Sequence, residues 1–214
     1  MSSSPERYRK ARFSVVDEVM PLDFIRELGE WFDAHRRDFV RGGDDAGLSR
    51  YNYEITDLDR HCDLLAPFHA ALVERFPAAL AACDVPDFEL RYIETHATLY
   101  HHGSHFVWHD DAPAYDGVLA PTRRVTFCLY LHTDPKMFEG GELEFLDGTR
   151  VEPINNRLVF FHPLQQHQVR RVECWSAEQL HGRWALMGWL HGDPPAGYVE
   201  SMPTMRGRPY DLNA

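Results

Sequence analysis

The 214-residue sequence predicts an α+β protein that is mainly β, a double-stranded β-helix (jelly roll) braced by N-terminal helices. Two observations lead to this fold class. Apolar residues recur at helical spacing in two segments of the first part of the chain. From about residue 88 onward the pattern changes to short runs of β-branched and aromatic residues separated by turn signals. Helices packed on one sheet of an antiparallel β structure satisfy both observations.

The N-terminal region is predicted to be mainly helical. A first strand is expected within residues 13–20, which carry three valines. A helix follows from Pro21, a residue tolerated in a first helical turn, and ends near residues 35–39. A second helix, rich in Ala and Leu, covers about residues 64–83 and is divided or bent at Pro77.

The remaining elements are short strands. One is expected at residues 51–55, and the others lie near residues 88–100, 104–110, 123–132, 142–146, 157–161, 166–173 and 183–191. Gly140-Gly141 is interpreted as a hairpin turn with a structural role. No internal repeat or linker is visible, so residues 1–214 are predicted to form one domain. Its parts are a mainly helical support (1–87), a jelly-roll catalytic core (88–192) and a C-terminal tail (193–214).

Composition excludes several classes of function. The 22 basic and 33 acidic residues give a net charge of −11, which disfavours a nucleic-acid surface because phosphate binding needs a basic face. Four scattered cysteines without metal-type spacing are typical of reduced thiols. No apolar run is long enough to span a membrane, and the first residues lack a secretory apolar segment. A cytoplasmic protein without a membrane partner is therefore expected.

One short motif carries the chemistry. In a strand, His109 and Asp111 point to the same face because they are two residues apart. By itself such a triplet is common, and a polar strand end is the plain alternative. A later histidine, His167, follows an aromatic run and completes a set of two imidazoles and one carboxylate. This set, with the other coordination positions open, is the ligand set of non-haem Fe(II) oxygenases.

Several other histidines lie close to these residues in the sequence. His162 is the main rival to His167, but it stands next to Pro163 and before the strand that would return to the metal. His167 is preferred because a branched apolar residue, Val169, follows it two positions on. The remaining nearby histidines are His101, His102, His105 and His132.

Two further residues are polar within apolar surroundings. Alternation along residues 123–132 puts Tyr130 on a mixed face that lines either solvent or a polar cavity. Arg183 opens a strongly apolar strand and therefore needs an anionic partner, because burying an unpaired guanidinium is costly. That partner is either a structural Asp or Glu or the carboxylate of a ligand, which suits the planar guanidinium fork. Trp189 shares the strand face of Arg183 and either faces the cavity or fills the core.

Five motifs in order carry a family resemblance. They are Tyr100-x-x-Gly103-x-x-Phe106-x-x-His109-x-Asp111, the segment 124–131, Gly140–Leu143, His167–Val169 and Gly182–Trp189. Together they resemble the prolyl-4-hydroxylase-like branch of the Fe(II)/2-oxoglutarate oxygenases. The resemblance covers about residues 88–192, while the earlier region matches only in its helical character.

The resemblance implies an enzyme with Fe(II) and 2-oxoglutarate as cofactor and co-substrate. Fe(II) would be held by His109, Asp111 and His167, and the far carboxylate of 2-oxoglutarate by Arg183 with Tyr100, Tyr130 or both. The implied reaction consumes O2, hydroxylates a substrate, and releases succinate and CO2, with L-ascorbic acid as an associated reductant. Relatives that halogenate carry a small residue at the position of Asp111, so its carboxylate favours hydroxylation, or another two-electron oxidation, over halogenation.

The sequence leaves the substrate open between a free amino acid or amino-acid-like molecule, another small metabolite, and a prolyl or peptidyl residue. The segments 42–49, 51–55 and 112–121 are expected to form the rim where it enters. The oligomeric state is also open, a homodimer being one alternative. Two other functions were weighed: a non-catalytic, cupin-like metal-binding sensor or scaffold, and a catalytically dead adaptor. A cupin usually presents His-x-His, and no position of the five motifs is lost here, so neither is preferred.

Overall fold

The structure is a computed structural model that describes residues 10–41, 50–111, 114–115, 118–119, 122–178 and 181–193. Its helices are α1 (Leu22–Ala34), the 3-10 helix η2 (Leu58–Arg60) and α2 (Leu65–Cys83). Its strands up to residue 131 are β1 (Phe13–Val16), β2 (Val40–Arg41), β3 (Arg50–Tyr51), β4 (Tyr53–Ile55), β5 (Tyr92–Tyr100), β6 (His105–His109), β7 (Ala114–Tyr115), β8 (Val118–Leu119) and β9 (Arg123–Leu131). The later strands are β10 (Phe138–Gly140), β11 (Leu143–Phe145), β12 (Arg150–Val151), β13 (Arg157–Phe161), β14 (His167–Val169), β15 (Val172–Cys174) and β16 (Arg183–His191).

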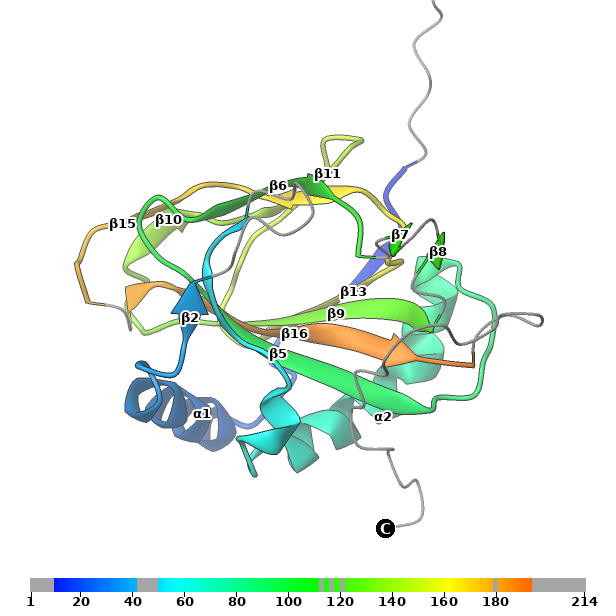
Figure 1. Ribbon diagram of the computed structural model, residues 1–214, viewed down its shortest axis with the longest axis horizontal. Helices are drawn as coiled ribbons and strands as arrows, with labels where there is room; N and C mark the ends of the chain where they lie inside the picture. The colour runs from blue at the N-terminus through cyan, green and yellow to red at the C-terminus, as the bar shows by residue number, and fades with distance from the viewer. Residues whose placement is uncertain are drawn as a thin grey trace, which may run out of the picture.

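Two antiparallel sheets form the body of the molecule. The larger has seven strands in the order β1-β13-β9-β16-β5-β4-β2, and the smaller has five in the order β12-β11-β14-β6-β3. Figure 1 shows them as two layers, with α1 and α2 against the outer face of the larger sheet. This arrangement confirms the predicted fold class, a double-stranded β-helix with helices bracing one sheet.

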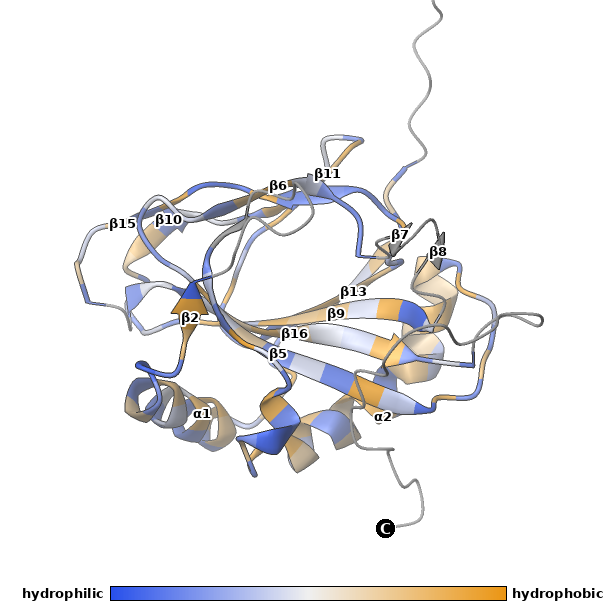
Figure 2. Ribbon diagram, in the orientation of Figure 1, coloured by the Kyte–Doolittle hydropathy of each residue, from blue (hydrophilic) through white to orange (hydrophobic). Residues whose placement is uncertain are grey.

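The main core lies between the helices and the larger sheet. Phe32 of α1 stacks on Trp184 of β16 with ring centroids 4.9 Å apart, and Phe68 of α2 meets Phe127 of β9 edge-on at 5.7 Å. These aromatic pairs and the aliphatic side chains around them form one buried cluster. Apolar residues follow the long strands of the larger sheet, as Figure 2 shows. Burial on this scale fixes which face of each strand turns toward the helices.

The opposite face of the same strands turns toward the smaller sheet. Cys128 and Tyr130 of β9 and Ala185 of β16 pack there with Leu143 and Phe145 of β11. The alternation along β9 thus separates a helix-facing set from a set that lies between the sheets. The functional residues discussed below come from this second face.

Some element boundaries differ from the sequence expectation. The strand expected at 166–173 is divided into two strands, β14 and β15. Strand β14 pairs with β6 and β11, whereas β15 pairs with β10. Helix α2 is continuous through Pro77, because this proline is exposed and the carbonyl that loses its partner can bind water. The strand placed at 88–100 begins only at Tyr92, and that at 51–55 is divided between β3 and β4.

Other expectations from the sequence concern residues that the structure does not describe. The loop at 42–49, most of 112–121 and residues 194–214 of the tail lie outside the described residues. The division into support, core and tail stays a prediction. Of the helices that the structure describes, none combines the length and apolar character needed to cross a bilayer.

A buried acid–histidine pair ties the helical layer to β5. His69 Nε2 of α2 lies 3.3 Å from Asp59 Oδ1 of η2 and 2.9 Å from Thr95 Oγ1. Burial raises the pKa of Asp59 to about 6 and lowers the pKa of His69 to about 4. Between about pH 4 and 6 the two groups therefore change the free energy of unfolding in opposite directions as the pH rises. The folded state holds the Asp59 proton more tightly than the unfolded chain, and the His69 proton less tightly.

The Asp59→Asn protein is therefore expected to gain stability steadily as the pH rises from about 4 to 6.5, because only the His69 contribution remains. At pH 7.5 its free energy of unfolding should exceed that of wild type by about 1–3 kcal/mol, since no buried carboxylate has to ionise. Urea unfolding of the metal-free proteins across pH 4–8 measures both effects. The opposite slope is expected for His69→Gln, whose stability should fall over the same range. If the stability of wild type, Asp59→Asn and His69→Gln changed with pH in the same way, Asp59 and His69 would not be the groups responsible.

Candidate metal centre and co-substrate site

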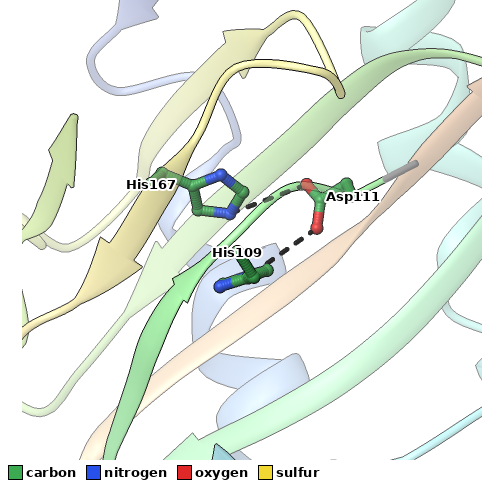
Figure 3. Close-up of side chains that lie close together, drawn as sticks. All are labelled: His109, Asp111 and His167. Atoms are coloured by element: carbon green, nitrogen blue, oxygen red, sulfur yellow. Dashed lines mark ion pairs between the residues drawn. The ribbon is translucent and has the colours of Figure 1, made fainter. Parts of the chain in front are cut away.

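His109, Asp111 and His167 come together between the sheets. One ligand atom from each lies within 4.8 Å of the others, and all three side chains are buried. His109 ends β6 and His167 begins β14, and the register pairs these two residues directly across the neighbouring strands. Figure 3 shows both imidazoles turned toward the Asp111 carboxylate. The structure thus assembles the three residues that the sequence motif predicted as ligands.

The two imidazoles are oriented by the strands that carry them. His109 Nδ1 lies 2.7 Å from the Val107 carbonyl, and His167 Nδ1 lies 2.9 Å from the Gln165 carbonyl. A carbonyl only accepts, so each Nδ1 donates, and in a neutral ring Nε2 then carries the lone pair. The rings are also clamped by aromatic neighbours, Phe106 against His109 at 3.5 Å and Phe161 against His167 at 4.7 Å between centroids. Both Nε2 atoms are therefore presented toward Asp111.

The spacing of these atoms fits a metal ion. His109 Nε2 lies 3.7 Å from Asp111 Oδ1, and His167 Nε2 lies 3.7 Å from Asp111 Oδ2. These distances are too long for hydrogen bonds. Protein nitrogen and oxygen ligands bind ions such as zinc at about 2.0–2.2 Å, so two ligands of one ion can lie roughly 4 Å apart. The donor set and its spacing suit a first-row divalent ion.

His162, the rival ligand, does not join this group. Its Nδ1 accepts a hydrogen bond from the Leu164 backbone N–H at 3.1 Å, which closes the turn before β14. The preference for His167 from the sequence agrees with this geometry.

Arg183 lies on the same inner face and is 2% exposed. Its guanidinium carbon is 4.8 Å from the centre of the Tyr100 ring and 4.7 Å from that of Tyr130. The Nε atom is buried without a hydrogen-bond partner, and no carboxylate of the described residues lies within 4.0 Å of the guanidinium nitrogens. A structural Asp or Glu partner, one of the two alternatives open from the sequence, is thus not found in the described part of the chain. A buried cation with spare donors suits an anionic ligand.

With this geometry described, the protein can be compared with known proteins. The sequence profile of the 2OG-Fe(II) oxygenase superfamily matches residues 95–191. Residues 95–191 thus share the sequence pattern of that superfamily. The matched segment runs from within β5 to the end of β16 and contains all three candidate ligands and Arg183.

Individual relatives agree with the family. An uncharacterized PKHD-type hydroxylase of Synechocystis sp. is 29% identical over 140 residues, which are 59% of this chain and 45% of that protein. This chain thus aligns with less than half of that relative's length. A Pseudomonas putida prolyl-4-hydroxylase structure has a TM-score of 0.61 at 21% identity, covering 86% of this chain and 94% of its own. A viral collagen prolyl hydroxylase of Paramecium Bursaria Chlorella virus-1, in a 2OG complex, has a TM-score of 0.62 at 14% identity, covering 86% and 98%. These structural likenesses show the shared fold.

Tyr130 lies against Arg183, and Cys128 belongs to the same buried cluster as Tyr130. Burial raises the pKa of Tyr130, so its hydroxyl stays a donor; it lies close to Cys128 and Arg183 but makes no hydrogen bond of good geometry among the described residues. Burial also raises the pKa of the Cys128 thiol to about 11, and it is affected by the charges of both Arg183 and Asp111. Phe161, which contacts His167, belongs to the same buried cluster as Tyr130.

Gly141 supports the position of Arg183 in a way that the sequence did not reveal. Gly140 and Gly141 both have positive φ, and they do not form a hairpin, because β10 pairs with β15 whereas β11 pairs with β14. The expectation of a hairpin was wrong. A Cβ on Gly141 would lie 2.7 Å from Arg183 Cδ, so the glycine leaves room for the arginine stem. Only the contact across strands, invisible in the sequence, links these two residues.

The other inward residues of the larger sheet form a second polar group. Trp189 of β16 meets His96 edge-on at 5.3 Å, and the Arg123 guanidinium carbon lies 3.3 Å from its ring centre. Trp189 thus lies between the sheets and does not belong to the helix-facing core. Arg124, the neighbour of Arg123, packs over Phe88 at 5.6 Å instead.

Proposed function

We propose that this oxygenase is an Fe(II)- and 2-oxoglutarate-dependent dioxygenase that hydroxylates an amino-acid-like or prolyl/peptidyl substrate. One observation carries the proposal. Three converging metal-type ligands and a buried guanidinium without a carboxylate partner share one inner face of the fold. The balanced reaction takes the substrate C–H, 2-oxoglutarate and O2 to the substrate C–OH, succinate and CO2.

In this proposal the side chains hold and orient the reactants. His109, Asp111 and His167 would bind Fe(II) on one side and leave the other positions to co-substrate and O2. The bound metal would supply the redox chemistry that couples 2-oxoglutarate decarboxylation to substrate oxidation. Thr126 donates a 2.8 Å hydrogen bond to Asp111 Oδ2 and so fixes the plane of that carboxylate.

Arg183 would bind the far carboxylate of 2-oxoglutarate. A planar guanidinium can donate two parallel hydrogen bonds to a carboxylate, and the absence of bulk water around a 2%-exposed side chain strengthens them. Tyr130 is well placed to add a third donor, because its buried hydroxyl has no partner among the described residues. Tyr100 lies directly across the strand pair from Arg183 and supports the guanidinium with its ring.

The names of the structural relatives favour the substrate class. Two of them are named as prolyl hydroxylases, one of them a collagen prolyl hydroxylase, and we extend this class to the present chain as a proposal. No observation favours the non-catalytic, cupin-like alternative. Use of L-ascorbic acid, a cytoplasmic location and the oligomeric state stay predictions.

Anaerobic titration of the protein with Fe(II) and 2-oxoglutarate tests the proposal. The expected result is a weak visible charge-transfer band that requires both additions and is lost in His167→Ala. Air exposure with proline-containing peptides or free amino acids should then give a +16 Da product and stoichiometric succinate. Metal binding without any 2-oxoglutarate binding would instead support a metal-binding sensor or scaffold.

Tyr130→Phe is expected to separate stability from co-substrate binding. Removing a buried hydroxyl without a partner should raise the stability of the ligand-free protein by about 1 kcal/mol. The same change should weaken 2-oxoglutarate binding by about tenfold if the hydroxyl donates to the co-substrate. Thermal unfolding and 2-oxoglutarate titration of one preparation measure both quantities. Tyr100→Phe is the matched variant, and a loss of affinity there alone would move the donor role to Tyr100.

A further inference from the structure

Asp111 lies outside any strand, yet it is held at three atoms by Pro163 and by two residues of β9, Arg123 and Thr126. Its backbone N–H donates to the Pro163 carbonyl at 2.8 Å. Its carboxylate accepts from Thr126 at 2.8 Å, and its carbonyl accepts from Arg123 Nη1 at 3.0 Å. Strand β6 ends at His109, so no sheet ladder fixes this residue. The position of the candidate ligand therefore depends on these three contacts.

Arg123, which provides the contact to the carbonyl, is itself held on two sides. Its Nη2 lies 3.3 Å from Glu94 Oε1. Its guanidinium covers the Trp189 ring at 3.3 Å, a favourable cation–π arrangement. The side chain is 17% exposed, so water competes little for its donors. One planar group thus joins β5, β9 and β16 to the backbone of Asp111.

Glu94 is a rigid anchor for this arginine. Its two oxygens lie 2.8 Å from His96 Nε2 and 2.9 Å from His191 Nε2. A carboxylate accepts only, so both imidazoles donate. His191 Nδ1 is 3.0 Å from the Thr122 hydroxyl, which completes the ring's hydrogen bonds. Burial alone would raise the pKa of Glu94, but the bonds from His191 and His96 and the charge of Arg123 keep it below its usual range.

We propose that Arg123 is a positioning residue for the metal centre, anchored by Glu94 and Trp189 and acting through the Asp111 carbonyl. This inference rests on the proposed function, since it takes His109, Asp111 and His167 as the ligands. Outer residues that orient a ligand typically change metal affinity about 10- to 100-fold when they are replaced. Because Arg123 contacts the backbone of Asp111 and not its carboxylate, we expect its replacement to change metal affinity by the lower end of that range.

An arginine with a purely structural role would pair with the Glu94 carboxylate and have no effect on the metal ligands. Replacing it would then lower the stability of the fold but leave the bound metal's coordination unchanged. A positioning arginine changes the geometry around the metal even at full occupancy. The experiment therefore needs a readout of coordination as well as of affinity.

Co(II) is the probe, because its visible ligand-field absorption reports coordination geometry without turnover. Arg123→Met is expected to bind Co(II) about tenfold more weakly than wild type and to show a changed absorption band at saturation. Arg123→Lys should recover part of both, since an ammonium reaches Glu94 or the carbonyl but lacks the fork to hold both. Arg124→Met is the matched control: it removes the neighbouring arginine, which packs over Phe88, and should behave as wild type.

Thermal unfolding of the metal-free proteins checks that the variants are folded. If Arg123→Met does not fold, the Co(II) measurements on Arg123→Lys still test the inference. Co(II) affinity and spectra equal to wild type in both Arg123 variants would overturn the inference and leave Arg123 as the structural partner of Glu94. A different failure belongs to the proposed function itself. In that case wild type would bind no Co(II), or His167→Ala would bind it as tightly as wild type.

Discussion

Asp111→Ala is expected to lose substrate hydroxylation and 2-oxoglutarate decarboxylation entirely while remaining folded. Asp111 supplies the only carboxylate of the candidate ligand group, and two histidines alone leave a divalent ion with weak and unselective binding. Because its side chain meets Thr126 and the ligand histidines rather than the hydrophobic clusters, its removal costs little core packing. Succinate release, product mass and metal content per chain are the three measurements.

The control for this substitution lies next to it. Asp110→Ala removes a carboxylate from the adjacent position, which is not part of the ligand group, and should keep metal content and turnover. His167→Ala should match Asp111→Ala in both losses. Near wild-type hydroxylation by Asp111→Ala would show that the ligand assignment is wrong at its most specific residue. Turnover retained only in metal-replete His167→Ala would point back to His162.

The fold class followed from the sequence because periodicity reports burial directly. The change from helical spacing to short strands marks the boundary between the helical layer and the sheets, and β13 and β16 were placed at their observed bounds. Two-residue strands such as β12 carry no periodic signal of their own. The division of 166–173 could not be seen because strand pairing, which assigns β14 and β15 to different sheets, is non-local.

The site could be predicted only where its residues share a motif. His109 and Asp111 are two positions apart, and Arg183 opens an apolar strand in which a cation is conspicuous. Arg123 is one of two adjacent arginines in the sequence. Its role depends on a register shift near the end of β16 that sets His191 opposite Arg123. No local pattern shows such an irregularity.

Arg183→Met is expected to weaken 2-oxoglutarate binding by roughly tenfold to a few hundredfold, because each charge-assisted hydrogen bond contributes about 1.5–3 kcal/mol. Arg183→Lys should recover only part of the affinity, since it keeps the charge and loses the fork. Co(II) affinity should stay near wild type in both variants, because the guanidinium would bind the end of the co-substrate that is far from the metal. Titrations of 2-oxoglutarate and of Co(II), carried out separately, measure the two affinities.

The stability of these variants sharpens the test. A buried guanidinium whose Nε has no hydrogen-bond partner destabilises the ligand-free fold, so Arg183→Met should unfold at the same temperature as wild type or higher. Added 2-oxoglutarate should stabilise metal-loaded wild type in proportion to its occupancy and do little for Arg183→Met. Arg171→Met, which removes an exposed arginine paired with Glu173, serves as the control and should respond as wild type does. If Arg183→Met lost stability and still bound 2-oxoglutarate tightly, Arg183 would be a structural residue, and another cation would have to hold the co-substrate.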